Sequence, residues 1–138
     1  MKRSFFDTNV LVYLYDDDTP EKQSTAMRVF EREIEADRAT LSTQVLQEFY
    51  VNVTRKLRPP LSHERAKPRV RDLSRLPLVR VDTPLILSAI GRSQRTSFSF
   101  WDALIVEAAL SAGADRLLTE DLKHGREVEG LRVENAFL

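Results

Sequence analysis

Residues 3–9 of the chain read Arg-Ser-Phe-Phe-Asp-Thr-Asn. The short apolar and aromatic stretch at residues 3–6 predicts a buried β-strand, and the Asp7-Thr8-Asn9 that follows is typical of a turn that starts a helix. A strand that runs directly into a helix is the beginning of a β–α–β unit, and such units build parallel sheets. Asp7 would then stand at the carboxyl end of the first strand.

The rest of the chain alternates between the same two kinds of element. Further strands are predicted at residues 39–41, 78–81, 116–118 and 131–133, and helices at residues 9–15, 20–37, 43–57, 83–95 and 101–110. A basic segment at residues 62–76 has a helical pattern but contains Pro68, which should kink the helix or split it in two. This order predicts one α/β domain over residues 1–138, a three-layer sandwich in which helices flank a central, mainly parallel sheet.

Composition excludes several classes of protein and of site. With 138 residues, of which 42% are hydrophobic and 30% charged, the chain can fold as one domain of ordinary size. The absence of cysteine excludes disulfides and thiolate metal sites, and two histidines argue against a histidine-rich zinc site, so a metal would be held mainly by oxygen. No apolar stretch suits a signal sequence or a membrane span, so we expect a cytoplasmic protein that does not enter the membrane.

Four acidic residues stand at informative places in this order of elements. Asp7 and Asp121 each follow a predicted strand, and ligands of open parallel sheets bind beyond the carboxyl ends of the strands. Asp102 lies in the first turn of an almost wholly apolar helix, where Ser99-x-x-Asp102 also forms a capping box. Glu48 is the acid that borders the apolar stripe of its helix. Each residue alone has an ordinary structural role, but together they suggest a shared site.

Carboxylates gathered at one edge of a sheet repel one another, and protonation, a basic partner or a bound cation relieves that repulsion. A Mg²⁺ ion takes six oxygen ligands, usually one or two carboxylates together with waters and substrate phosphates. Such an ion can activate water to hydrolyse a phosphodiester bond. The chain lacks a cysteine nucleophile and a recognisable Ser-His-Asp set, so metal-assisted hydrolysis is favoured over covalent catalysis.

The charges of the chain are unevenly distributed. Lys and Arg total 21, and so do Asp and Glu, which makes the formal net charge zero. Residues 55–80 nevertheless hold nine basic and two acidic residues, so this segment carries a charge of +7 and the remainder −7. A polyanion would be attracted to the basic segment and repelled from much of the rest. A solvated basic helix without a partner is the simpler interpretation of the same pattern.

Four segments, in this order, resemble the PIN domain, and within it the VapC-type toxin ribonucleases of type II toxin–antitoxin pairs. They are residues 5–11 (FFDTNVL), 47–49 (QEF), 99–106 (SFWDALIV) and 117–122 (LLTEDL). The resemblance extends over nearly the whole chain. It implies a PIN-like fold with a central parallel sheet between helices, which agrees with the order of elements above.

The resemblance also implies roles for particular residues. Asp7, Glu48, Asp102 and Asp121 would be the catalytic acids that hold Mg²⁺ or Mn²⁺, and Asn9 and Thr119 would orient them. Whether Glu120 or His124 takes part in the site stays open. The family implies an RNA substrate, a homodimer and inhibition by a small antitoxin protein. Weaker candidates for RNA contact are the basic residues Arg55, Lys56, Arg58, Arg65, Lys67 and Arg69.

Other functions fit parts of the same pattern. A non-enzymatic module could bind nucleic acid or a protein through residues 55–80, with structural acids. A PIN-type nuclease could instead act in RNA processing or on DNA, because phosphate contacts carry no information about the sugar. Phosphohydrolases with an aspartate nucleophile need a second Asp two residues after the first, where this chain has Asn9. The sequence does not identify the RNA target.

Overall fold

The computed structural model describes residues 2–138, and it confirms the predicted fold class: a mainly parallel sheet flanked by helices. The first half of the chain forms β1 (Arg3–Phe6), α1 (Thr8–Tyr13), α2 (Pro20–Glu35), β2 (Ala39–Ser42), α3 (Thr43–Arg55) and α4 (His63–Leu73). The second half forms β3 (Leu78–Val79), α5 (Thr83–Arg95), α6 (Phe100–Ser111), β4 (Ala114–Leu118), β5 (Glu127–Val128) and β6 (Leu131–Glu134). No helix within residues 2–138 is long and apolar enough to span a membrane.

The strand order places the carboxyl ends of β1 and β4 next to each other. The six strands lie in the order β3-β2-β1-β4-β6-β5, and every neighbouring pair is parallel except β5 and β6. The chain moves from β1 to β2 and β3 on one side, then returns to place β4 on the other side of β1. This reversal is the switch point at which open α/β sheets bind ligands. Because Phe6 pairs with Leu118, residues 7 and 119 leave the sheet together.

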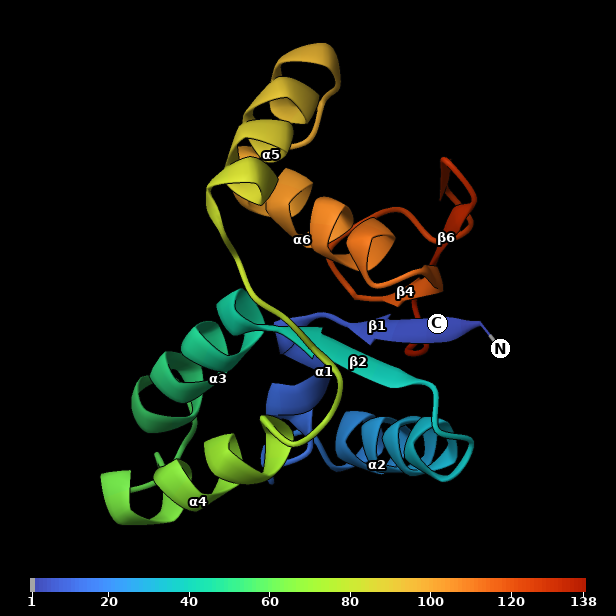
Figure 1. The fold of residues 1–138 in the computed structure, drawn as a ribbon. Coiled ribbons are helices and arrows are strands. Elements are labelled where there is room, and N and C mark those ends of the chain that lie inside the picture. The colour runs from blue at the N-terminus through green and yellow to red at the C-terminus, as the bar shows by residue number, and fades with distance from the viewer. Residues whose placement is uncertain (1) are drawn as a thin grey trace.

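Helices cover both faces of the sheet. Figure 1 shows α5 and α6 on one face and α1, α2, α3 and α4 on the other. The central strands supply fully buried side chains such as Phe5, Phe6 and Leu117. In α6, six of the twelve residues are buried, in agreement with a helix that the sequence predicts to be apolar nearly all round. Burial of this helix therefore fixes the position of its first turn, which carries Asp102.

Two details differ from the prediction. Pro68 lies inside one continuous helix, α4, and does not split it. Proline removes one backbone hydrogen bond, but Ala66 and Leu73 are buried on the same helix, and their packing keeps the turns on both sides of Pro68 together. The two-residue strand β5 was not predicted, because its antiparallel pairing with β6 arises only when the chain turns back through Gly130.

A buried cluster of charged residues stabilises the sheet at the edge opposite the acidic residues. Glu33 of α2 is fully buried and accepts hydrogen bonds from Ser4, Arg32, Arg38 and Arg116. Burial raises the pKa of Glu33, but the hydrogen bonds from Arg38, Ser4 and Arg32 and the charge of Arg116 outweigh it and bring the pKa to about 2. The cluster joins α2 to β1 and β4, so it stabilises the strands whose other ends carry the acidic residues.

Candidate active site

Asp7 links the end of β1 to the start of α1. Its side chain caps the helix, because Oδ1 accepts a hydrogen bond of 2.7 Å from the backbone N–H of Thr8. Its other oxygen, Oδ2, accepts a hydrogen bond of 2.8 Å from the hydroxyl of Thr119, which follows β4. The residue is only 6% exposed. Two elements that are distant in sequence therefore hold this carboxyl group in one orientation.

The environment of Asp7 disfavours its negative charge. Burial is the largest cause of a pKa that rises from 3.8 to about 7, and the charges of Asp121 and Glu48 raise it further. The hydrogen bonds from Thr119 and Thr8 oppose this rise but do not cancel it. Among residues 2–138, no lysine or arginine forms an ion pair with Asp7. The site therefore favours the binding of a proton or another cation at this carboxylate.

A small network positions the loop that carries Asp121. The Thr119 oxygen that donates to Asp7 also accepts from the backbone N–H of Asp121 at 3.1 Å and from Asn9 Nδ2 at 3.4 Å. Asn9 Oδ1 accepts from the backbone N–H of Glu120 at 3.3 Å. Asn9 and Thr119, for which the sequence suggested an orienting role, thus contact both the buried acid and the loop after β4.

Glu48 reaches the site from α3 through a threonine. The hydroxyl of Thr8 donates a hydrogen bond of 2.7 Å to Glu48 Oε1, while the backbone N–H of Thr8 donates to Asp7. Gln44, one turn earlier on α3, donates from Nε2 to Glu48 Oε2 at 3.4 Å. Thr8 therefore bridges two predicted acids, a role that the sequence analysis missed although Thr8 adjoins Asp7.

A cavity of about 640 Å³ opens beside these residues, between α1, α3, the start of α6 and the loop after β4. Three of the four predicted acids, Asp7, Glu48 and Asp121, contribute to its wall. Trp101 and Lys56 also line it, and Lys56 brings a positive charge to a cavity that is otherwise acidic. A hollow with carboxylates and one cation can accept a metal ion together with a phosphate.

Asp102, the fourth predicted acid, lies at the start of α6 beside this cavity. It is partly buried in the first turn of α6, and its backbone N–H donates to Ser99 Oγ at 3.1 Å, as the capping box predicts. Its neighbour Trp101 lines the cavity, but Asp102 does not. Within residues 2–138, no three acidic or histidine side chains converge into a preformed metal site.

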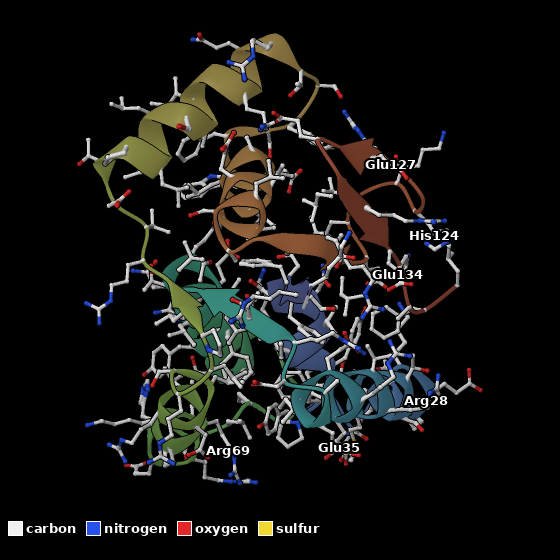
Figure 2. The ribbon with its side chains drawn as sticks, turned by 45° about the vertical axis from the view of Figure 1, so that its right-hand side comes forward. Arg28, Glu35, Arg69, His124, Glu127 and Glu134 are labelled. Carbon is white, nitrogen blue, oxygen red and sulfur yellow. The ribbon has the colours of Figure 1, made fainter. Side chains whose placement is uncertain are left out.

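The two residues that the sequence left open lie in other contacts. Glu120 accepts from Lys22 Nζ at 2.5 Å and from the Tyr13 hydroxyl at 2.6 Å. Burial raises the pKa of Glu120, but these two partners outweigh it and lower the pKa overall. His124 Nδ1 accepts from the backbone N–H of Asn135 at 3.0 Å, and Figure 2 shows His124 at the edge of the molecule near β5 and β6. Glu120 is thus tied to α1 and α2, and His124 to the residue that follows β6.

The basic candidates are exposed and belong to the end of α3, the segment that follows it, and α4. Arg55 ends α3, Lys56 follows it, and Figure 2 shows Arg69 at the outer side of α4. Of the six candidates, Lys56 alone lines the acidic cavity. Lys67 lines a second hollow of about 700 Å³ between α3 and α4. The whole set of candidates, all exposed, comprises Arg55, Lys56, Arg58, Arg65, Lys67 and Arg69.

Gln44 and Trp101 are further wall residues that the sequence analysis did not single out. Gln44 is 4% exposed, and Trp101 is 61% exposed. A buried amide one turn before Glu48 gives no recognisable sequence signal, whereas a tryptophan directly before Asp102 is visible in the sequence. Its exposure cannot be predicted from an apolar helix, because the pattern places tryptophan in the core.

Several solved structures share this fold. A toxin–antitoxin complex from Klebsiella pneumoniae contains a chain 18% identical to this one, with a TM-score of 0.69 and coverage of 96% of this chain and 97% of that chain. DNA-bound VapBC from Salmonella typhimurium gives 22% identity, a TM-score of 0.64 and 99% coverage of both chains. Mycobacterium tuberculosis VapC20, a toxin that cleaves the sarcin–ricin loop, gives 20% identity, a TM-score of 0.62 and coverage of 83% and 86%.

Identities at this level show a shared fold and no more. No curated protein sequence matches the chain. The model of the PIN domain family, however, matches residues 4–127, which include most of β1, the four predicted acidic residues and the cavity wall. Because this match spans most of the sequence, the chain belongs to the PIN domain family.

Proposed function

We propose that the chain is a divalent-metal-dependent endoribonuclease that hydrolyses RNA phosphodiester bonds and acts as the toxin of a toxin–antitoxin pair. The observation that carries this proposal is Asp7, a buried carboxylate without a basic partner in residues 2–138, with its pKa raised to about 7. It lies at the switch point of the sheet and shares a cavity with Glu48 and Asp121. A bound cation would remove this electrostatic cost.

The donors of the cavity suit a hard cation such as Mg²⁺ or Mn²⁺. The acidic side chains all offer carboxylate oxygens as donors. Mg²⁺ commonly binds one or two carboxylates and fills its remaining positions with water and phosphate oxygens. Asp7, Glu48, Asp102 and Asp121 would hold the ion. Thr8 joins Asp7 to Glu48 through hydrogen bonds, and Asp7, Glu48 and Asp121 line the cavity. When bound, the ion would polarise water and neutralise the phosphate that is cut.

The protein side chains would keep the reacting groups in place. Thr8 and Thr119 donate to the two oxygens of Asp7, so this carboxylate cannot rotate when the phosphate approaches. Asn9 and Thr119 hold the backbone of residues 120 and 121, and thereby fix Asp121. Lys56 at the rim would attract the phosphate backbone. The carboxylates of the cavity could accept the proton that water releases.

The named relatives support the biological part of the proposal. VapC20 is a toxin that cleaves the sarcin–ricin loop, and the chains from Klebsiella and Salmonella come from toxin–antitoxin complexes. A small antitoxin would need an apolar surface, and the hollow between α3 and α4 offers Leu46, Tyr50 and Val70 beside Lys67. We further expect a homodimer in the cytoplasm. A small protein that copurifies from the native source would support the pairing.

The direct test is cleavage of total cellular RNA by the purified protein, with Mg²⁺ and with a chelator. Asp7→Asn and Asp121→Asn should abolish cuts that the wild type makes in Mg²⁺, and Asp102→Asn tests the fourth acid. Asp18→Asn is a matched control, because Asp18 is exposed and does not line the acidic cavity. Full activity of Asp7→Asn, or equal activity in chelator, would refute the proposal.

The same assay separates the proposal from its alternatives. Single-stranded DNA of matched sequence should stay intact, and its cleavage would instead indicate a nuclease that does not distinguish the sugar. RNA that is bound but not cut under any metal would favour a binding module. Mapping the cut ends would show whether the enzyme selects a loop, as sequence-specific RNA recognition generally does.

A further inference from the structure

We propose that Trp101 and Gln44 form a subsite for one unpaired nucleobase of single-stranded RNA, on the wall of the acidic cavity. The inference rests on the proposed nuclease function and specifies how its substrate is held. Both residues line the same cavity as Asp7 and Glu48. A base bound there would lie beside the phosphodiester bond that is cut.

Trp101 presents a large aromatic surface to solvent at the cavity. Its side chain is 61% exposed although it lies at the second position of α6, a helix that is otherwise mostly buried. Phe100 meets the indole edge to face, with ring centroids 5.1 Å apart and an interplanar angle of 73°. The backbone carbonyl of Trp101 also accepts from Gln44 Nε2 at 3.5 Å. An exposed aromatic face held in this way is suited to stacking a base.

Gln44 supplies an unused hydrogen-bond acceptor at the same place. Its side chain is 4% exposed, and its Oε1 atom is buried without a hydrogen-bond partner. The Nε2 atom faces two acceptors, Glu48 Oε2 and the carbonyl of Trp101, so exchanging the amide oxygen and nitrogen would bring oxygens together. A buried acceptor that lacks a partner is costly. An N–H group on the edge of a nucleobase would satisfy it.

The other residues of α3 that line the cavity favour single-stranded RNA as the ligand. Gln44, Glu48, Asn52 and Lys56 recur every four residues, and all of them line the cavity. They therefore form one row along the helix, from the amide beside Trp101 to the cation at the rim. A base in the subsite and a phosphate at Lys56 would lie along this row. A duplex keeps its bases stacked and paired, so it cannot offer a base to Trp101.

The intrinsic fluorescence of the protein reports on this subsite directly, because Trp101 is the single tryptophan in the sequence. The probe is a short single-stranded oligoribonucleotide of mixed sequence, titrated with Mg²⁺ present into the Asp7→Asn variant, which should not cut it. We expect saturable quenching of Trp101 emission and much weaker quenching by the same sequence as a duplex. No quenching by the single strand would overturn the proposal. If a neutral quencher also fails to reach Trp101, a protein surface covers the indole.

Kinetics distinguish failure of the subsite from failure of the enzyme. In wild-type background with Mg²⁺, Trp101→Ala should raise KM roughly 5- to 100-fold, the range for loss of one stacked base, and Trp101→Phe should recover part of it. Gln44→Leu should change the base preferred beside the cut. Leu87→Ala, which shortens an equally exposed side chain on α5, is the control and should leave KM unchanged. Normal KM and unchanged cut sites in both variants would refute the subsite while leaving the nuclease intact. Quenching without any cleavage would refute the nuclease while supporting base binding.

Discussion

Replacing Asp7 with asparagine should change how the stability of the protein depends on pH. Its pKa is raised from 3.8 to about 7 in the folded state, so the folded protein binds this proton more tightly than the unfolded chain does. The stabilising contribution of that proton is complete below pH 3.8 and is lost as the pH rises through 7. One pKa unit corresponds to about 1.4 kcal/mol, so the shift limits the effect to about 4 kcal/mol.

We expect the Asp7→Asn variant to gain stability relative to the wild type as the pH increases. The difference in unfolding free energy should change by up to about 4 kcal/mol between pH 4 and pH 8. A constant offset of about 1 kcal/mol would reflect altered hydrogen bonds with Thr8 and Thr119. Asparagine keeps one oxygen that can accept from the backbone N–H of Thr8, so the start of α1 should remain capped.

Urea denaturation in chelator at several pH values measures this difference directly. Comparing the two proteins cancels the titration of all other groups, and Asp18→Asn shows the effect of losing an exposed charge. At pH 8, Mg²⁺ at 100 times its dissociation constant should stabilise the wild type by about 2.7 kcal/mol. It should stabilise Asp7→Asn less. Parallel pH profiles for wild type and Asp7→Asn would refute the argument that burial and neighbouring acids disfavour this charge.

Three other substitutions test the surrounding framework. Glu33→Gln removes the buried charge that fastens α2, and urea denaturation at pH 7 should show a loss of about 3 kcal/mol. Because the pKa of Glu33 is lowered to about 2, the wild-type advantage should be present above pH 4.5 and disappear as the pH falls toward 2; an advantage independent of pH would contradict this. Pro68→Ala restores a backbone N–H inside α4 and should raise the thermal midpoint by an amount equivalent to about 1–3 kcal/mol, whereas a lower midpoint would show that the proline ring stabilises the helix. Lys22→Met leaves Glu120 without its cation and should reduce RNA cleavage while changing stability by less than about 1 kcal/mol, since Lys22 is partly exposed. Unchanged cleavage would mean that Thr119 and Asn9 alone hold the loop.

Most of the fold can be predicted from the sequence, because the residue pattern of each element and the order of the elements along the chain indicate the same architecture. The four residues of β1 are followed directly by Asp-Thr-Asn, so a buried strand, a cap and an acid at the sheet edge can all be predicted from seven residues. The apolar character of α6 predicts its central place. The pattern could not predict β5, whose two residues pair only with β6. Of the two effects expected for Pro68, a kink or a split, the split does not occur, since tertiary packing of α4 outweighs the loss of one backbone hydrogen bond.

The site was less predictable because its contacts join elements that are distant in sequence. That Asp7 and Asp121 share one edge follows from strand order, but the contact between Thr8 and Glu48 requires α1 to pack against α3. Residue type did not reveal that Lys22 and Tyr13 engage Glu120. The unpaired oxygen of Gln44 likewise depends on which groups surround it after folding. The sequence thus predicts which residues are chemically suited to a site, and the packing of the fold determines which of them lie at the cavity without another partner.

The zero net charge of the chain has a different meaning once the charges are placed. The positive segment extends from the end of α3 through α4 to β3, and Lys56 brings its charge to the acidic cavity from the end of α3. A phosphate backbone attracted to Lys56 would therefore meet Glu48 two turns away, and beyond it Asp7. That approach is repulsive unless a cation has first neutralised the carboxylates. Binding of RNA at the cavity and hydrolysis would then share one requirement, because the same ion removes the repulsion and activates the water.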